Sequence, residues 1–136
     1  MHSIETVSLD DAKFVAAAAA AKAVREGWPV VIAILDRGGH SLYLERADDV
    51  QLGSIVVAQE KARTALLFKR PTKVLQDRVN GEHPNMLSLP GATAIDGGIP
   101  LVRGDQIVGS IGVSGVLSTQ DAEVAAAGVS AFDGLC

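Results

Sequence analysis

Aromatic residues and cysteine are scarce in this chain of 136 residues. Aromatic side chains make up 4% of the sequence, so the core has to be built from Val, Ile, Leu and Ala. The single cysteine, Cys136, ends the sequence, which excludes an intrachain disulfide and gives no sign of an oxidising compartment. No apolar run approaches the roughly 20 residues that span a membrane, and no basic segment precedes an apolar stretch near the N-terminus. We therefore expect a cytoplasmic protein with no membrane partner.

Positive charge is also in short supply. Lys and Arg number 12 against 16 Asp and Glu, which gives a formal net charge of −4, and no Lys/Arg run occurs. This balance argues against a nucleic-acid partner. Hydrophobic residues reach 48% and charged residues 21%, as in soluble globular domains with a substantial core. The length predicts one domain over residues 1–136.

The common catalytic and nucleotide-binding motifs are missing. The sequence contains no Walker loop, no GxGxxG loop, no HExxH and no Cys/His cluster with zinc spacing. We therefore predict no metal site built from these motifs. Nothing in the spacing ties a histidine to a serine, so a Ser–His–acid triad cannot be argued either.

Helical and extended segments follow one another in an order that indicates the fold class. Strands arrive in hairpins and do not alternate singly with helices, so we predict an antiparallel sheet and an α+β fold. Capping residues and apolar periodicity set the helix boundaries, because Ser and Gly are typical of helix starts and ends. The predicted helices are Ser8–Glu26, Leu52–Lys69, Lys73–Val79 and Ser118–Phe132, and the predicted strands are Val30–Leu35, His40–Arg46, Ala92–Ile95 and two within Gly97–Gly115.

The hairpin Gly97–Gly115 is the most informative stretch. Gly104-Asp105 predicts a tight two-residue turn between two strands. Alternation places Ile107, Gly109, Ile111 and Val113 on one face of the second strand and Val108, Ser110, Gly112 and Ser114 on the other. The second set shrinks to small side chains, which is typical of a close approach by a ligand or by other backbone. Two interpretations stay open: a ligand occupies space above this face, or a helix lies close on it.

Several polar residues stand out for their positions. Lys61 and Thr64 lie beside apolar residues on the second helix, and we expect Lys61 to extend its ammonium group to water. Ser118 and Asp121 have the spacing of a capping box at the start of the last helix. Asn80–Gly91 is the longest irregular stretch, and loops of this kind often carry function.

Four segments together resemble the GlcG/HbpS family, which includes the C-terminal domain of PduO-type adenosyltransferases and 4-hydroxylaminobenzoate lyase. They are ILDRGGHSLYLER, LGSIVVAQEKARTALLFKRPT, GGIPLVRGDQIVGSIGVSG and QDAEVAAAG. The resemblance implies a profilin-like α+β domain with a five-stranded antiparallel sheet in the order 2-1-5-4-3. It also implies homo-oligomers from dimers to octamers, and binding of haem or another tetrapyrrole in some members.

The family's motifs fall on Asp36, Gly38, Gly39 and His40, on Lys61–Thr64 and on Gly109–Gly115. The loop Arg46–Leu52 departs from the family's usual R-M-D-G-A-P pattern and adds acidic residues. Extra negative charge at the rim of a pocket would oppose the two propionates of haem.

Two functional hypotheses follow from the resemblance, beside a third in which the oligomer is purely structural. The first is an oligomeric protein that binds haem or a related tetrapyrrole over the small strand face. Its expected ligand-binding residues are Arg46, Thr64, Ser110, Ser114 and Gly115, with His40, His83 or Met86 as axial ligand. The second is a lyase that acts on a small aromatic hydroxylamino acid. There Arg46 or Lys61 would hold the carboxylate, and Glu45, His40 or Lys61 would transfer protons.

Overall fold

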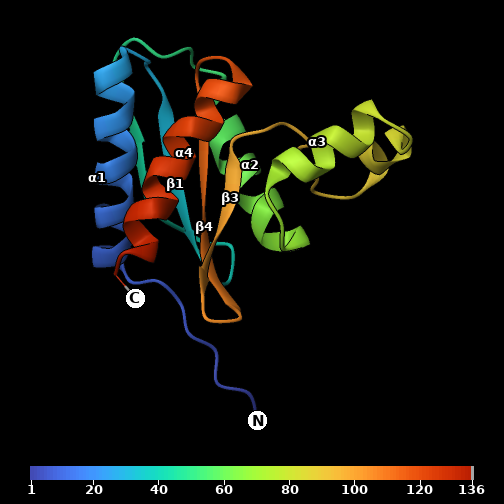
Figure 1. Ribbon diagram of the computed structural model, residues 1–136, viewed down its shortest axis with the longest axis horizontal. Coiled ribbons are helices and arrows are strands. Elements are labelled where there is room, and N and C mark those ends of the chain that lie inside the picture. Colours follow the sequence, from blue (N-terminus) through green and yellow to red (C-terminus); the bar gives the residue numbers. More distant parts are fainter. Residues whose placement is uncertain (136) are drawn as a thin grey trace.

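A four-stranded antiparallel sheet lies between two helical layers (Figure 1). The structure, a computed structural model, describes residues 1–135, so Cys136 lies outside the described residues. Helices α1 and α4 pack side by side on one face of the sheet, and α2 packs on the other. The elements are α1 (Leu9–Glu26), β1 (Val31–Asp36), β2 (Ser41–Arg46), α2 (Ser54–Phe68), α3 (Thr72–Asn80), the 3-10 helix η1 (Pro84–Ser88), β3 (Gly98–Arg103), β4 (Gln106–Ser114) and α4 (Ser118–Asp133).

The sheet has the strand order β2-β1-β4-β3, which confirms the predicted α+β class with an antiparallel sheet. The fifth strand, expected over Ala92–Ile95, is absent from the part of the chain that the structure describes. Side chains take its backbone bonds instead. Thr93 N–H donates to Thr64 Oγ1 at 2.9 Å, and Asp96, which directly follows this segment, donates its N–H to Gln76 Oε1 at 2.8 Å. The observed order is therefore the expected order without its third strand.

The two elements that lead into the sheet form as predicted. Ser8 and Asp11 make a reciprocal capping box at the start of α1, and Gly27 ends the helix in the left-handed conformation with φ 73°. β1 is buried on both faces, because Ile32 packs in the α1/α4 core and Ala33 packs on the α2 side. This agrees with an interior strand that is apolar at every position.

A β-bulge in β4 changes which side chains face each layer. Leu101 pairs with Gly109 and Val102 pairs with Ile107, which leaves Val108 as the extra residue. Val108 is buried in the core with α1 and α4, whereas Ile107 lines a hollow beside α2. The simple alternation predicted for this strand is therefore wrong at these two residues, because one extra residue reverses the side-chain direction.

Helix α2 lies directly on the small-residue face of β4. A Cβ on Gly112 would lie 2.0 Å from Ala58 O and 2.6 Å from Ala62 N, so only glycine allows this approach. Ser110 Oγ donates to Ala62 O at 2.7 Å. Of the two interpretations, the close helix is correct. The ligand space expected above Ser110, Gly112 and Ser114 is filled by α2.

The segment from α3 through η1 extends away from the body formed by the sheet and its two helical layers (Figure 1). Thr72 anchors its base, because its Oγ1 accepts the Gly98 N–H at 2.9 Å. The predicted helix over Lys73–Val79 is confirmed, one residue longer at each end. Within residues 1–135, no helix is both long and apolar enough to cross a bilayer.

Candidate functional site

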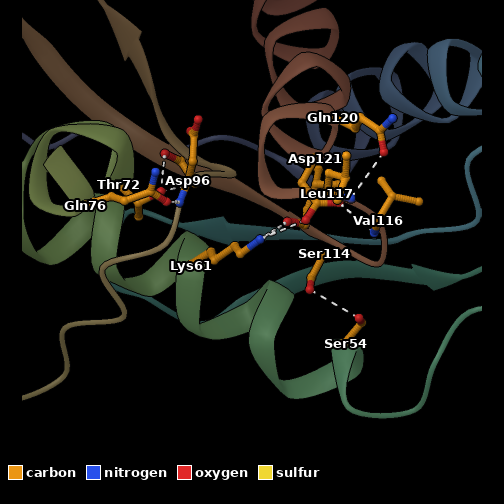
Figure 2. Close-up of polar contacts among 12 residues, drawn as sticks. Ser54, Lys61, Thr72, Gln76, Asp96, Ser114, Val116, Leu117, Gln120 and Asp121 are labelled. Carbon is orange, nitrogen blue, oxygen red and sulfur yellow. Dashed lines mark hydrogen bonds and ion pairs between the residues drawn. The ribbon is translucent and has the colours of Figure 1, made fainter. Parts of the chain in front are cut away.

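Lys61 lies in the interior and not at the surface. Its side chain is 2% exposed, and its ammonium lies 2.9 Å from Val113 O and 3.0 Å from Asp121 Oδ2 (Figure 2). The expectation that it extends to water is wrong, because a buried carboxylate reaches it from α4. The ion pair joins α2, β4 and α4 at one point.

Asp121 has a second role at the start of α4. Its Oδ1 accepts the Val116 N–H at 3.1 Å, and Gln120 Oε1 accepts the Leu117 N–H at 3.2 Å (Figure 2). The predicted capping box between Ser118 and Asp121 is therefore wrong, since the aspartate turns inward and the glutamine takes the capping position. Burial raises the pKa of the Asp121 carboxyl, and the Lys61 ammonium acts in the opposite direction.

Two glycines close the space around the ion pair. Gly97 has φ 128°, and a Cβ there would lie 2.9 Å from Lys61 Nζ and 2.7 Å from Val113 O. A Cβ on Gly98 would lie 2.2 Å from Lys61 O. Backbone thus packs directly against the lysine, which leaves no room there for a substrate. The proton-transfer role predicted for Lys61 stays a prediction, and its contacts are those of a structural ion pair.

The other polar groups along the junction of α2 and the sheet also have partners within the protein. Ser114 Oγ lies 3.2 Å from Ser54 Oγ, and Thr64 Oγ1 lies 2.7 Å from Glu60 O and 3.1 Å from Gly91 O. Among the residues described, every buried side-chain nitrogen and oxygen has a hydrogen-bond partner. We call this row the polar seam, and it comprises Ser54, Lys61, Thr64, Thr72, Ser110, Ser114 and Asp121.

Gly115 marks the end of the seam. It has φ 152°, and a Cβ there would lie 2.5 Å from Pro29 O. The ligand-binding roles predicted for Thr64, Ser110, Ser114 and Gly115 stay predictions. Their contacts hold α2 and the loops to the sheet.

The three residues predicted to transfer protons are not brought together. Glu45 lines a separate cleft of about 70 Å³ on the α1 side, next to Trp28 and Val24. Lys61 lies on the α2 side of the sheet, and His40 is exposed at the turn between β1 and β2. Arg46 is exposed at the end of β2. Glu45 and Lys61 therefore lie on opposite sides of the sheet.

His83 and Met86 belong to the projecting segment. His83 is exposed just before η1, and its backbone carbonyl accepts the Met86 N–H at 3.1 Å. Met86 is half-buried. Neither residue lines the cleft beside Glu45 or the hollows around Arg37 and Lys69.

Two hollows lie together at the end of the sheet that carries the β3–β4 turn, the lower end in Figure 1. Their volumes are about 250 and 200 Å³, and they adjoin because they share Arg37, Lys69 and Ile107. We call them jointly the basal hollow. The larger part is lined also by His2, Ser3, Ile4, Asp105 and Gln106, and the smaller part by Gly38, Leu66 and Leu67.

His40 does not line the basal hollow itself but lies against Gly38, which does. A Cβ on Gly38 would lie 3.2 Å from His40 Cδ2 and 3.5 Å from its Nε2, so the imidazole packs over this glycine. Asp36 Oδ1 accepts the N–H groups of Gly38 and His40 at 2.9 and 3.0 Å. Gly39 completes the turn with φ 86°. The family motif at Asp36–His40 thus builds a tight turn that presents a histidine beside the hollow.

Two cationic side chains enter the basal hollow from different elements. Arg37 follows β1, its N–H donates to Thr6 Oγ1 at 2.9 Å, and its guanidinium donates to Ile107 O. Lys69 caps the C-terminus of α2 with φ 57°, a positive φ that no other non-glycine residue among 1–135 adopts. Sequence reasoning missed both residues. The available signal was a lysine where a helix end usually has glycine.

Comparisons with known proteins agree with this fold. Residues 7–130 match the family model described as "Haem degrading protein HbpS-like". Protein GlcG of Escherichia coli K12 is 41% identical over 103 residues, which cover 76% of this chain and 77% of GlcG.

Two solved structures show the same arrangement. Protein ORFY of Klebsiella pneumoniae superposes with a TM-score of 0.93 at 29% identity, covering 100% of this chain and 97% of that one. A PduOC:haem complex superposes with a TM-score of 0.82 at 29% identity, covering 93% of this chain and 94% of that one. On the sequence match and the shared fold, the chain belongs to the HbpS-like family.

Proposed function

We propose that this protein binds haem or a related tetrapyrrole at the basal hollow. The observation that carries the proposal is the packing of the His40 imidazole against Gly38, a residue that lines the smaller part of the hollow. Imidazole is a common axial ligand of haem iron. Family membership supports the ligand class, and so does the similarity to a protein whose structure is a complex with haem.

The residues of the basal hollow fit a porphyrin better than those of the small strand face. Leu66, Leu67 and Ile107 offer apolar surface for the ring, as ligand sites usually do. The small strand face offers none, since α2 packs against it. Bound haem would supply redox and ligand-binding chemistry at its iron. The chain's own contribution would be to orient the ring and present the imidazole.

Assembly and location remain proposals as well. We propose a homo-oligomer between dimer and octamer, in which a second copy covers the open side of the basal hollow, and a cytoplasmic location. Native mass spectrometry of the protein from its own host would give the subunit number and show any retained tetrapyrrole. A monomer that binds haem fully would refute the covering role of a second copy.

Haem titration followed by the Soret band tests the function. The wild-type protein should shift the band, and His40→Ala should lose the shift attributable to imidazole ligation. His83→Ala is the matched control, because this histidine is exposed on the projecting segment. Loss of the shift in His83→Ala with retention in His40→Ala would place the ligand on the projecting segment. No shift with the wild-type protein would refute haem binding.

A further inference from the structure

We infer that Arg37 and Lys69 form an anion-binding pair in the basal hollow, which selects flat apolar ligands that carry carboxylates. The inference rests on the proposed function for its ring-shaped ligand. It adds that carboxylates, independently of iron, determine which ligands bind. Both cations line both parts of the basal hollow.

The smaller part of the hollow combines positive charge with apolar surface. Its lining contains Arg37 and Lys69 but no acidic residue, and its remaining wall includes Leu66, Leu67 and Ile107. A ligand with an apolar body and an anionic edge matches this arrangement. A purely apolar ligand would bury two cations without supplying a polar partner for either. A cationic ligand would be repelled.

Other ionisable groups around the hollow do not cancel the positive charge of Arg37 and Lys69. Asp105 and His2 line only the larger part. The Asp36 carboxylate is engaged by two backbone N–H groups of its own turn. Arg70 donates its Nε–H to Phe68 O at 2.7 Å, at the negative end of the α2 dipole. A helix C-terminus alone repels anions, so an anion here depends on the two side-chain cations.

The backbone at Lys69 supports a role for its side chain. A non-glycine residue in the left-handed region is destabilising because its Cβ crowds the following carbonyl oxygen, and helices commonly end there with glycine. This chain uses glycine at the equivalent position of α1, where Gly27 has φ 73°. At the end of α2 it has lysine with φ 57°. Strained residues cluster at ligand sites, because there the side chain compensates for the strain.

Arg37 is positioned for carboxylate recognition. The contact of its guanidinium with Ile107 O fixes the planar fork at the rim between the two parts of the hollow. A guanidinium matches a carboxylate in a bidentate manner, whereas lysine acts as a compact point charge. Together, Arg37 and Lys69 suit a ligand that has two carboxylates, or a ligand with a single carboxylate that contacts both cations.

Metal-free protoporphyrin IX and its dimethyl ester separate this inference from haem ligation. Fluorescence titration of the wild-type protein should show at least tenfold weaker binding of the ester. Lys69→Gly and Arg37→Gln should each weaken binding of the free acid about tenfold and leave the ester unchanged. The controls Lys13→Gln and Arg25→Gln remove exposed charges on α1 and should change neither. Raised salt should weaken only the free acid.

The melting temperature gives Lys69→Gly a second, opposed readout. Glycine relieves the left-handed strain, so the variant should melt no lower than wild type while it binds the free acid less well. If lysine served only to stabilise the end of α2, Lys69→Gly would retain full binding, and the inference would be wrong. Equal affinity for acid and ester would also overturn it. Binding of protoporphyrin IX without a His40-dependent haem shift would refute iron ligation alone, and binding of neither would refute both.

Discussion

The polar seam and the basal hollow both contain a lysine from α2, yet the two lysines are held in opposite ways. Lys61 is enclosed, has a carboxylate and a carbonyl as partners, and lies against glycine backbone. Lys69 has a strained, left-handed backbone conformation, and it lines an open concave surface. The comparison teaches that complete internal pairing marks a structural charge. A charge held over a hollow at a cost in backbone strain marks a candidate ligand site.

Removing the buried charge tests the first half of this comparison most severely. Lys61→Met leaves the Asp121 carboxylate and Val113 O without their partner, which should lower the free energy of unfolding by about 3–5 kcal/mol. Urea denaturation measures this loss. Porphyrin affinity of the folded fraction should stay at the wild-type value. A large loss of affinity without a loss of stability would reverse the two assignments.

Acid provides an internal check on the same variant. Without the ammonium, the pKa of Asp121 should rise further, so Lys61→Met should regain stability as pH falls and the carboxyl protonates. The double variant Lys61→Met with Asp121→Asn keeps an acceptor for Val116 N–H but carries no buried charge. It should be more stable than the single variant at pH 7. Equal stability would show that the pair is uncoupled.

The close contact between α2 and β4 is the next most sensitive feature. Gly112→Ala places a methyl group against the Ala58 carbonyl, which cannot move without shifting the helix. We expect a loss of about 3 kcal/mol in the free energy of unfolding. Gly53→Ala is the matched control, since a Cβ at Gly53 meets nothing within 4 Å. If both variants melted alike, the helix would not lie as close to the strand as described.

We expect the smallest change in stability from substitution of Asp96, at the base of the projecting segment. Burial is the main reason that the pKa of its carboxyl is raised. The neutral form is therefore favoured in the folded state. The stability that the neutral Asp96 carboxyl contributes is fully present below the pKa of the unfolded state. It is lost as pH rises through the higher pKa of the folded state. Asp96→Asn should thus melt slightly higher than wild type at pH 7, and the gain should shrink toward pH 4. A gain that grows on acidification would mean that the pKa is lowered instead.

Local rules predicted the elements whose signals are local. The caps of α1 at Ser8 and Gly27 depend on neighbours within one helical turn. The turn at Gly104, with φ 63°, needs only its own two residues. Helical periodicity also placed Lys61 and Thr64 beside apolar residues on α2. These features require no knowledge of the tertiary fold.

The errors arise where distant segments decide the outcome. The partner of Lys61 is 60 residues away, so no spacing within α2 could show that its ammonium is buried. The bulge at Val108 depends on the register with β3. Ala92–Ile95 resembles a strand, but its Thr93 N–H donates to a side chain of α2, and the adjoining Asp96 N–H donates to a side chain of α3. Arg37 and Lys69 meet only because a strand end and a helix end converge.

The Lys61–Asp121 contact also constrains how the chain can reach its folded state. The ammonium belongs to the middle of the sequence and its carboxylate to the last helix, 60 residues later. During synthesis, α2 emerges with a charge on the very side that must dock on the sheet, and the counter-ion is made 60 residues later. Burial of this helix is therefore linked to the synthesis of α4, which favours one concerted transition over stepwise accumulation of partly docked forms.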